Sequence, residues 1–154
     1  MTTVAEAAKD FLAQRRIAVA GVSRVAQGHG GNYIYGRLKS RGYLVFAVNP
    51  NADVVEGDHW YRSLEAIPGG VDAVVIATNP SATGAVIAEA ARLGIKRAWM
   101  HRSMGSGSVD EPAAAAGRAA GMTVIAGSCP LMFEPASDFG HKCMRLFMGG
   151  KPTV

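Results

Sequence analysis

Apolar residues near the start of the chain recur with the spacing of one helix face. They stand at i, i+3, i+4, i+7 and i+8, and they are Val4, Ala7, Ala8, Phe11 and Leu12. This stripe is what an amphipathic helix buries, so we expect a leading helix over 4–16. The next residues, 17–22, form a nearly continuous apolar run, which is typical of a strand buried in a parallel sheet.

Further apolar runs predict four more strands with helices between them. The strands are expected over 44–48, 73–77, 97–100 and 122–126. The helices are expected over 32–41, 80–94, from a capping-box pattern at 108–111 to 121, and over 139–148. Strands that alternate with helices at this pitch indicate βαβ units. We therefore predict an α/β fold, a Rossmann-like doubly wound parallel sheet of about five strands with helices on both faces.

Length and composition are those of one domain. The chain has 154 residues, 49% of them apolar and 18% charged, so we expect a single domain over 1–154 with one core. The first sixteen residues lack the apolar stretch of a signal peptide. No run reaches the roughly 20 apolar residues that a membrane span requires. We therefore expect a cytoplasmic protein with no membrane partner.

The charge balance narrows the partners. Sixteen Lys and Arg against twelve Asp and Glu give a net charge of +4, which fits an anionic ligand. Because the basic residues are scattered, nucleic acid is not an expected partner. The histidines and the two cysteines lack the spacing of a zinc site, so we expect no metal. A homo-oligomer stays open, because the Met-rich tail is suited to core packing or to a subunit contact.

The loop after the first strand is the first candidate for ligand binding. A doubly wound sheet binds its ligand at the carboxyl ends of the strands. Gly21 would let the backbone approach a diphosphate, and Ser23 offers a hydroxyl beside the next helix start. We expect Gly21→Val to abolish nucleotide binding in a folded domain. The alternative is an ordinary flexible turn at Gly28, Gly30 and Gly31.

Neither common phosphate-binding fingerprint is present in this loop. After Gly21 the next glycine comes seven positions later, so Gly-x-Gly-x-x-Gly is absent, as is the Gly-Lys-Ser/Thr of a phosphate loop. The second strand ends in Asn49, where an NAD-binding fold usually has Asp or Glu for the ribose. A neutral Asn49 tolerates a ribose that carries a phosphate, and Arg24 is suited to pair with that phosphate.

Several segments together resemble a known family. They are Ala-Val-Ala-Gly-Val-Ser at 18–23, Asn-Tyr at 32–33, Val-Asn-Pro at 48–50, Thr-Asn-Pro at 78–80 and Ser-Cys-Pro at 128–130. From about Arg15 to about Pro130 the chain resembles the single-domain CoA-binding proteins, relatives of the CoA-binding domain of succinyl-CoA synthetase.

The resemblance implies a Rossmann-like fold that binds coenzyme A. It places the diphosphate against Gly21, Val22, Ser23, Arg24, Asn32 and Tyr33, and the adenine between Asn49, Pro50, Thr78, Asn79 and Pro80. Two departures from the family pattern leave open which residues bind the pantetheine end of the ligand. The family often has a Gln-x-Gly turn where this chain has the longer polar segment 101–108, and often has Arg where Ser128 stands.

Three residues after the fourth and fifth strands are candidates for chemistry. His101 is suited to act as an acid or base, and Arg102 to meet a phosphate or carboxylate. Cys129 is suited to act as a nucleophile if its pKa is lowered. The simpler interpretations are a hydrogen-bonded loop histidine and a small buried thiol.

Three functions follow as hypotheses. The leading one is a CoA-binding module without catalysis of its own, acting as a carrier, sensor or regulatory subunit, because no complete catalytic constellation is visible. The second is an enzyme that uses CoA or an acyl-CoA with His101 or Cys129. The third is an NAD(P)-binding oxidoreductase, which would require an acidic residue to reach the ribose by a route other than the second strand.

Overall fold

A computed structural model describes residues 1–24, 29–51, 54–55, 58–103, 105–147 and 151–154. Its helices are α1 (Val4–Leu12), α2 (Gly30–Ser40), α3 (Pro80–Arg92), α4 (Glu111–Ala119), α5 (Phe139–Phe147) and the 3-10 helix η1 (Pro130–Met132). Its strands are β1 (Arg16–Ala20), β2 (Leu44–Val48), β3 (Val54–Val55), β4 (Asp58–Tyr61), β5 (Ala73–Ile76), β6 (Arg97–Met100) and β7 (Thr123–Ala126). None of the helices in these ranges is long and apolar enough to cross a lipid bilayer.

The strands of the described residues form one sheet in the order β3-β4-β2-β1-β5-β6-β7. All neighbouring pairs are parallel except β3 and β4, which pair antiparallel at one edge. The chain runs from β1 to β2 on one side and then returns to β5 on the other side of β1. This reversal of strand order makes the carboxyl ends of β1 and β5 the topological switch point, where ligands bind in folds of this kind.

The predicted fold class is confirmed, and the expected number of strands was too low. No strand was expected between 48 and 73, whereas this part of the chain holds β3 and β4. The residues of β4 alternate instead of forming an apolar run: the Trp60 side chain is buried and the His59 side chain is exposed. A strand near the edge of the sheet that is buried on one side only lacks the continuous hydrophobic signal by which the central strands are recognised.

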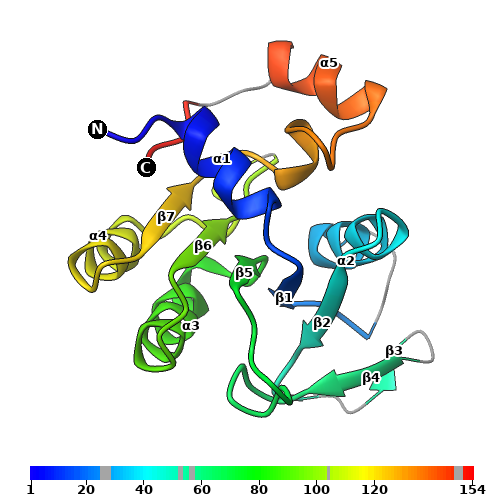
Figure 1. Ribbon diagram of the computed structural model, residues 1–154, viewed down its shortest axis with the longest axis vertical. Helices are drawn as coiled ribbons and strands as arrows, with labels where there is room; N and C mark the ends of the chain where they lie inside the picture. Colours follow the sequence, from blue (N-terminus) through cyan, green and yellow to red (C-terminus); the bar gives the residue numbers. More distant parts are fainter. Residues whose placement is uncertain (25–28, 52–53, 56–57, 104, 148–150) are drawn as a thin grey trace.

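Each central strand sends alternate side chains into two separate cores. Ile17 and Val19 of β1 pack with α1 and α2 on one face, whereas Ala18 and Ala20 pack with α3 and α4 on the other. Figure 1 shows these two pairs of helices on opposite sides of the sheet. Because both faces are covered, the strands read as continuous apolar runs.

The end of α1 and the start of α4 differ from the prediction for identifiable reasons. Helix α1 ends at Leu12, four residues early, because Arg16 already opens β1 and donates hydrogen bonds to the carbonyls of Pro68 and Gly70. Helix α4 begins after Asp110, not after Ser108. The Asp110 carboxylate accepts from the backbone N–H of Ala113 and is the true N-cap.

Candidate functional site

Gly21 lies at the switch point between β1 and β5. It adopts φ +95°, and a Cβ there would lie 2.5 Å from the Ala77 carbonyl oxygen. The chain therefore needs glycine at this position so that the ends of β1 and β5 can converge, whatever the ligand. Gly21→Val is therefore expected to destabilise the fold, because its side chain would collide with backbone, so a loss of binding in that variant would not by itself place a ligand at this loop.

The backbone of the first loop is held by a buried asparagine. The Asn32 side chain, 6% exposed, accepts from the Ser23 N–H and donates to the Ser23 carbonyl, both at 2.8 Å. Val22 is buried in the core, and Arg24 is exposed to solvent. The structure therefore makes Asn32 a residue that orients the loop through the Ser23 backbone. Of the three glycines proposed as a flexible turn, Gly30 and Gly31 begin α2, and Gly28 lies outside the described residues.

Asn49 joins the end of β2 to the first loop. Its side-chain nitrogen donates to the Val22 carbonyl and its side-chain oxygen accepts from the Asn51 N–H, both at 2.8 Å. Pro50 follows as an exposed residue. An aspartate here could not donate to Val22 and would place a carboxylate against its carbonyl. The choice of Asn at 49 thus has a structural reason beside the ligand-based one.

The residues after β5 lead directly into α3. Pro80 is the first residue of that helix, and Asn79 is its N-cap residue, although its side chain makes no capping hydrogen bond. The Thr78 hydroxyl lies 3.3 Å from the hydroxyl of Thr83, which donates to the Ser108 carbonyl at 2.7 Å. These contacts tie the end of β5 to the loop that precedes α4. The exposed Asn79 amide is left to face solvent or a ligand.

A cavity of about 360 Å³ opens at this edge of the sheet and gathers four of the residues expected to bind a ligand, namely Gly21, Asn49, Pro50 and Thr78. Its wall combines apolar side chains of α3, such as Val86, with polar groups. The sequence analysis missed two charged residues of this wall, Arg62 and Glu89. Arg62 follows β4, the strand that the sequence analysis did not find. Glu89 lies in α3, about two and a half turns after the first residue of that helix, away from the loops in which binding residues were expected.

The imidazole of His101 lies against the first turn of α2. A Cβ on Gly30 would lie 2.8 Å from Cε1 of His101, so the loop after β6 and the N-terminus of α2 are in direct contact. His101 is 8% exposed. Burial, with a smaller contribution from His141, lowers its pKa to about 4, so the ring is neutral at pH 7. The N-terminus of α2 thus faces a neutral ring, which leaves its positive dipole end available to an anion.

The other two candidates for chemistry are Cys129 and Arg102. Burial raises the pKa of the Cys129 thiol to about 12, so the thiol stays protonated and fits the simpler interpretation of a small buried side chain. Arg102 turns toward the chain after β7, where a Cβ on Gly127 would lie 3.4 Å from its Nη2. Among the described residues, no group of three or more His, Cys, Asp and Glu side chains is placed to hold a metal ion.

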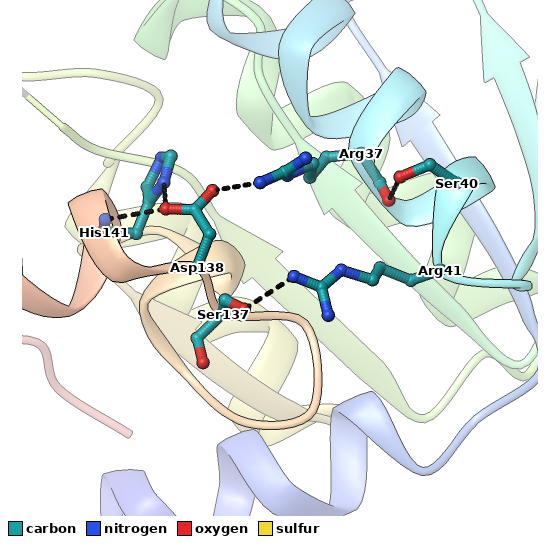
Figure 2. A network of polar contacts seen from close by, with 6 residues as sticks. All are labelled: Arg37, Ser40, Arg41, Ser137, Asp138 and His141. Atoms are coloured by element: carbon teal, nitrogen blue, oxygen red, sulfur yellow. Dashed lines mark hydrogen bonds and ion pairs between the residues drawn. The ribbon is translucent and has the colours of Figure 1, made fainter.

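A polar network between α2 and α5 was not foreseen from the sequence (Figure 2). One oxygen of Asp138 accepts from Arg37 of α2 at 2.8 Å, and the other contacts Nδ1 of His141 at 2.8 Å and accepts from the His141 N–H at 2.9 Å. Three hydrogen-bond donors hold the pKa of the Asp138 carboxyl well below its usual range, the His141 N–H contributing most. The ring of Tyr33 stacks on His141, with centroids 5.5 Å apart. Arg37 and Asp138 are 101 positions apart in the sequence, so no local sequence pattern predicts their contact.

Comparisons with known proteins give the family of this chain. A family model described as a CoA-binding domain matches residues 15–135, which confirms the resemblance noted in the sequence. The ADP-forming acetate–CoA ligase II of Archaeoglobus fulgidus is 36% identical over 92 residues, 58% of this chain. The chain spans only 14% of the length of that ligase.

Solved structures show the same fold. A hypothetical protein from Pyrococcus horikoshii superposes with a TM-score of 0.76 and 25% identity, covering 84% of this chain and 88% of that one. The dinucleotide-forming acetyl-coenzyme A synthetase 1 of Candidatus Korarchaeum cryptofilum superposes with a TM-score of 0.61 and 28% identity, over 71% of this chain. This chain covers 25% of that synthetase.

Proposed function

Because this chain belongs to the family of CoA-binding domains, we propose that it binds coenzyme A at the carboxyl edge of its sheet, as a carrier, sensor or regulatory module over residues 1–154. The observation that carries the proposal is the cavity of about 360 Å³ at the switch point, which brings together Gly21, Asn49, Pro50 and Thr78. Their convergence is the arrangement that a nucleotide requires in a doubly wound fold.

The cavity suits the adenosine end of the ligand. Apolar side chains of α3 such as Val86 can cover a base, and Asn49, Pro50 and Thr78 can flank it. Asn79 and Pro80 begin α3 at the same edge. Arg62 in the cavity wall and Arg24 in the first loop are cations suited to the ribose phosphate of CoA.

The N-terminus of α2 suits the diphosphate. The first loop approaches it through Gly21, Val22 and Ser23, and Asn32 keeps the Ser23 backbone in place. Backbone N–H groups at a helix start bind phosphate without a basic side chain. Tyr33 lies in the first turn of the helix, 54% exposed, where its ring can border the ligand. When bound, CoA would supply a thiol.

One observation favours a second candidate, a nucleotide with a free ribose diol such as NAD. Glu89 lines the same cavity and brings a carboxylate to it from α3. A carboxylate near the ribose would accept hydrogen bonds from a diol and would repel a 3′-phosphate, by about one to a few kcal/mol at short range. An enzyme that uses His101 or Cys129 is less well supported, because the first is a weak base and the second stays protonated.

Competition binding with CoA, dephospho-CoA and NAD tests the proposal. We expect affinities in that order, since a charge-assisted contact to the 3′-phosphate contributes about 1.5 to 3 kcal/mol. The order should persist in Glu89→Gln, which removes the negative charge and keeps an oxygen that can accept from the Glu65 N–H, and the CoA affinity should rise. NAD binding as tight as that of CoA, with a loss of NAD affinity in Glu89→Gln, would establish the second candidate instead.

Variants of two asparagines separate the effect of losing the Asn49 hydrogen bond from the effect of adding a negative charge to the cavity. Asn49→Asp breaks the hydrogen bond to Val22 and adds a carboxylate, whereas Asn51→Asp adds a carboxylate to the same cavity and leaves that bond intact. If charge alone matters, both variants narrow the difference in affinity between CoA and dephospho-CoA. If the bond to Val22 holds the loop, Asn49→Asp in addition loses affinity for all three ligands.

A further inference from the structure

The network of Asp138 and His141 has the geometry of a general base. Because Nδ1 of His141 lies 2.8 Å from the Asp138 carboxylate, which can only accept, Nδ1 carries the proton and Nε2 of the neutral ring holds a free electron pair. The carboxylate also stabilises the ring once Nε2 is protonated. This pairing is the one by which an aspartate orients a catalytic histidine in hydrolases.

Three elements surround this pair. Helix α2 contributes Arg37 and Tyr33, and the loop after β6 contributes His101. The chain after β7 contributes Cys129, and burial together with the Asp138 charge raises the pKa of its thiol. Arg37 is the cation bound to Asp138, and it adds to the hydrogen bonds from His141 that hold the pKa of this carboxyl below its usual range. The His141 side chain is 15% exposed, so it is partly desolvated and still reachable.

The pair lies beside the N-terminus of α2, on the side away from the proposed adenosine cavity. Tyr33 of the first turn of α2 stacks on His141, and His101, which His141 influences electrostatically, touches Gly30. The cavity lies instead between the ends of β1 and β2 and helix α3. In CoA the adenosine and the thiol are at opposite ends, with the diphosphate between them. A ligand with its diphosphate at α2 therefore directs its thiol away from the cavity and toward His141.

The Cys129 thiol beside the pair is not a nucleophile for it to activate. The Cys129 thiol is buried and has a raised pKa, and His101 is too weak a base to deprotonate a thiol at neutral pH. The incoming thiol of the ligand is the group in this region that needs a base. A thiol is a poor nucleophile until it loses its proton.

We propose that His141, oriented by Asp138, is the general base for the thiol of bound CoA. In this step the S–H bond breaks with its electron pair left on sulfur, and the proton forms a bond to Nε2 of His141. No other reactant is consumed. The proposal rests on the proposed function, because it requires CoA to be bound with its diphosphate at α2. With this base, the protein would bind CoA and also convert its thiol to a reactive thiolate.

The test is a pH titration of the thiolate absorbance of CoA bound to the full chain, with bound S-methyl-CoA, which has no ionisable thiol, as the blank. We expect the thiolate of bound CoA to appear about one pH unit lower than that of free CoA. In His141→Gln the midpoint should return to that of free CoA. Asp138→Asn, which can still accept from the His141 N–H and cap α5, should shift the midpoint most of the way back.

Lys142→Gln is the matched control, because Lys142 is the next residue of α5 and pairs with Glu134 instead of with the network. It should leave the midpoint at the wild-type value. A wild-type midpoint equal to that of free CoA, or one unchanged in both His141→Gln and Asp138→Asn, overturns the proposal. A merely structural role for the network would lower the unfolding temperature of these variants without moving the midpoint.

Calorimetric titration of CoA into each protein separates the two proposals. If the wild-type chain does not bind CoA, the proposed function itself fails. If the chain binds CoA and the thiolate midpoint is normal, only the general base is refuted. Should His141→Gln not fold, Asp138→Asn alone decides the outcome.

Discussion

At the scale of single residues, Gly21 shows how a position that suggests a ligand site can be required by the fold. Its φ of +95° and the Ala77 carbonyl 2.5 Å from a would-be Cβ both act before any ligand arrives. A left-handed non-glycine residue costs roughly 1–2 kcal/mol and overpacking roughly 1–3 kcal/mol.

We predict that Gly21→Ala lowers the free energy of unfolding by at least about 2 kcal/mol, measured by urea denaturation. Gly36→Ala is the matched control, because Gly36 lies within α2 and a Cβ there meets no atom within 4 Å. That change should be neutral or should stabilise by about 0.5–1 kcal/mol, as alanine is the better helix former. Equal stability of the two variants would remove the packing argument.

His101 should make the stability of the fold depend on pH. Its pKa is about 4 in the folded chain, against the ordinary histidine value of 6.5 in the unfolded one, so between these values the unfolded chain binds the additional proton. Stability is therefore fully present above pH 6.5 and is lost as the pH falls toward 4. We predict a loss of about 2 kcal/mol between pH 7.5 and pH 5 from this group.

The measurement for His101 is the free energy of unfolding at both pH values in the wild type, His101→Gln and His59→Gln. The first variant should lose most of this pH dependence, whereas His59, which is exposed on β4, should make no difference. A wild-type pH dependence retained in His101→Gln would mean that the imidazole is not held neutral by burial.

At the scale of elements, the start of α4 was misplaced because Ser108 and Asp110 are both good N-cap residues. Pro112 decides between them. It has no N–H, so it fits the first turn of a helix that begins at Glu111, whereas with Ser108 as N-cap it would interrupt the first helical hydrogen bond. The bond that forms instead runs from the Ala114 N–H to the Asp110 carbonyl.

We predict that Asp110→Ala lowers the free energy of unfolding by about 1 kcal/mol, because it leaves the Ala113 N–H without its acceptor. Asp110→Asn keeps an acceptor oxygen and should cost only a few tenths of a kcal/mol. Chemical denaturation monitored by circular dichroism measures both. A larger loss in Ser108→Ala than in Asp110→Ala would restore the sequence-based boundary.

At the scale of the whole molecule, the proposed site joins segments that belong to different elements, since the first loop, the ends of β2 and β5 and the start of α2 converge on one edge. A ligand that binds there should hold these parts together. Binding of this kind stabilises the folded state by about 2.7 kcal/mol at a ligand concentration one hundred times Kd.

We predict that CoA at that concentration raises the melting temperature by roughly 5–10 °C. Adenosine 3′,5′-bisphosphate, which keeps the nucleotide end, should reproduce much of the shift, and pantetheine should produce little. Differential scanning calorimetry gives the values. If pantetheine stabilises the chain and the nucleotide does not, the adenosine cavity at the switch point is wrongly assigned.

The sequence by itself determined the fold class and the central strands, because β1, β5, β6 and β7 are covered on both faces and must be apolar throughout. It also determined the family, through short segments around Gly21, Asn49 and Thr78 that remain readable in isolation. Apolar periodicity and turn residues are local properties of the chain, so they can be recognised in the sequence alone.

Only the tertiary structure decided what those segments do. It showed that Asn32 and Asn49 hold loop backbone, that Glu89 and Arg62 line the cavity, and that His101 is neutral. It also brought Arg37 to Asp138 and His141, across 101 residues of sequence. Hydrogen bonds, desolvation and the convergence of strand ends depend on distances in space, and the order of residues along the chain does not contain those distances until the chain has folded.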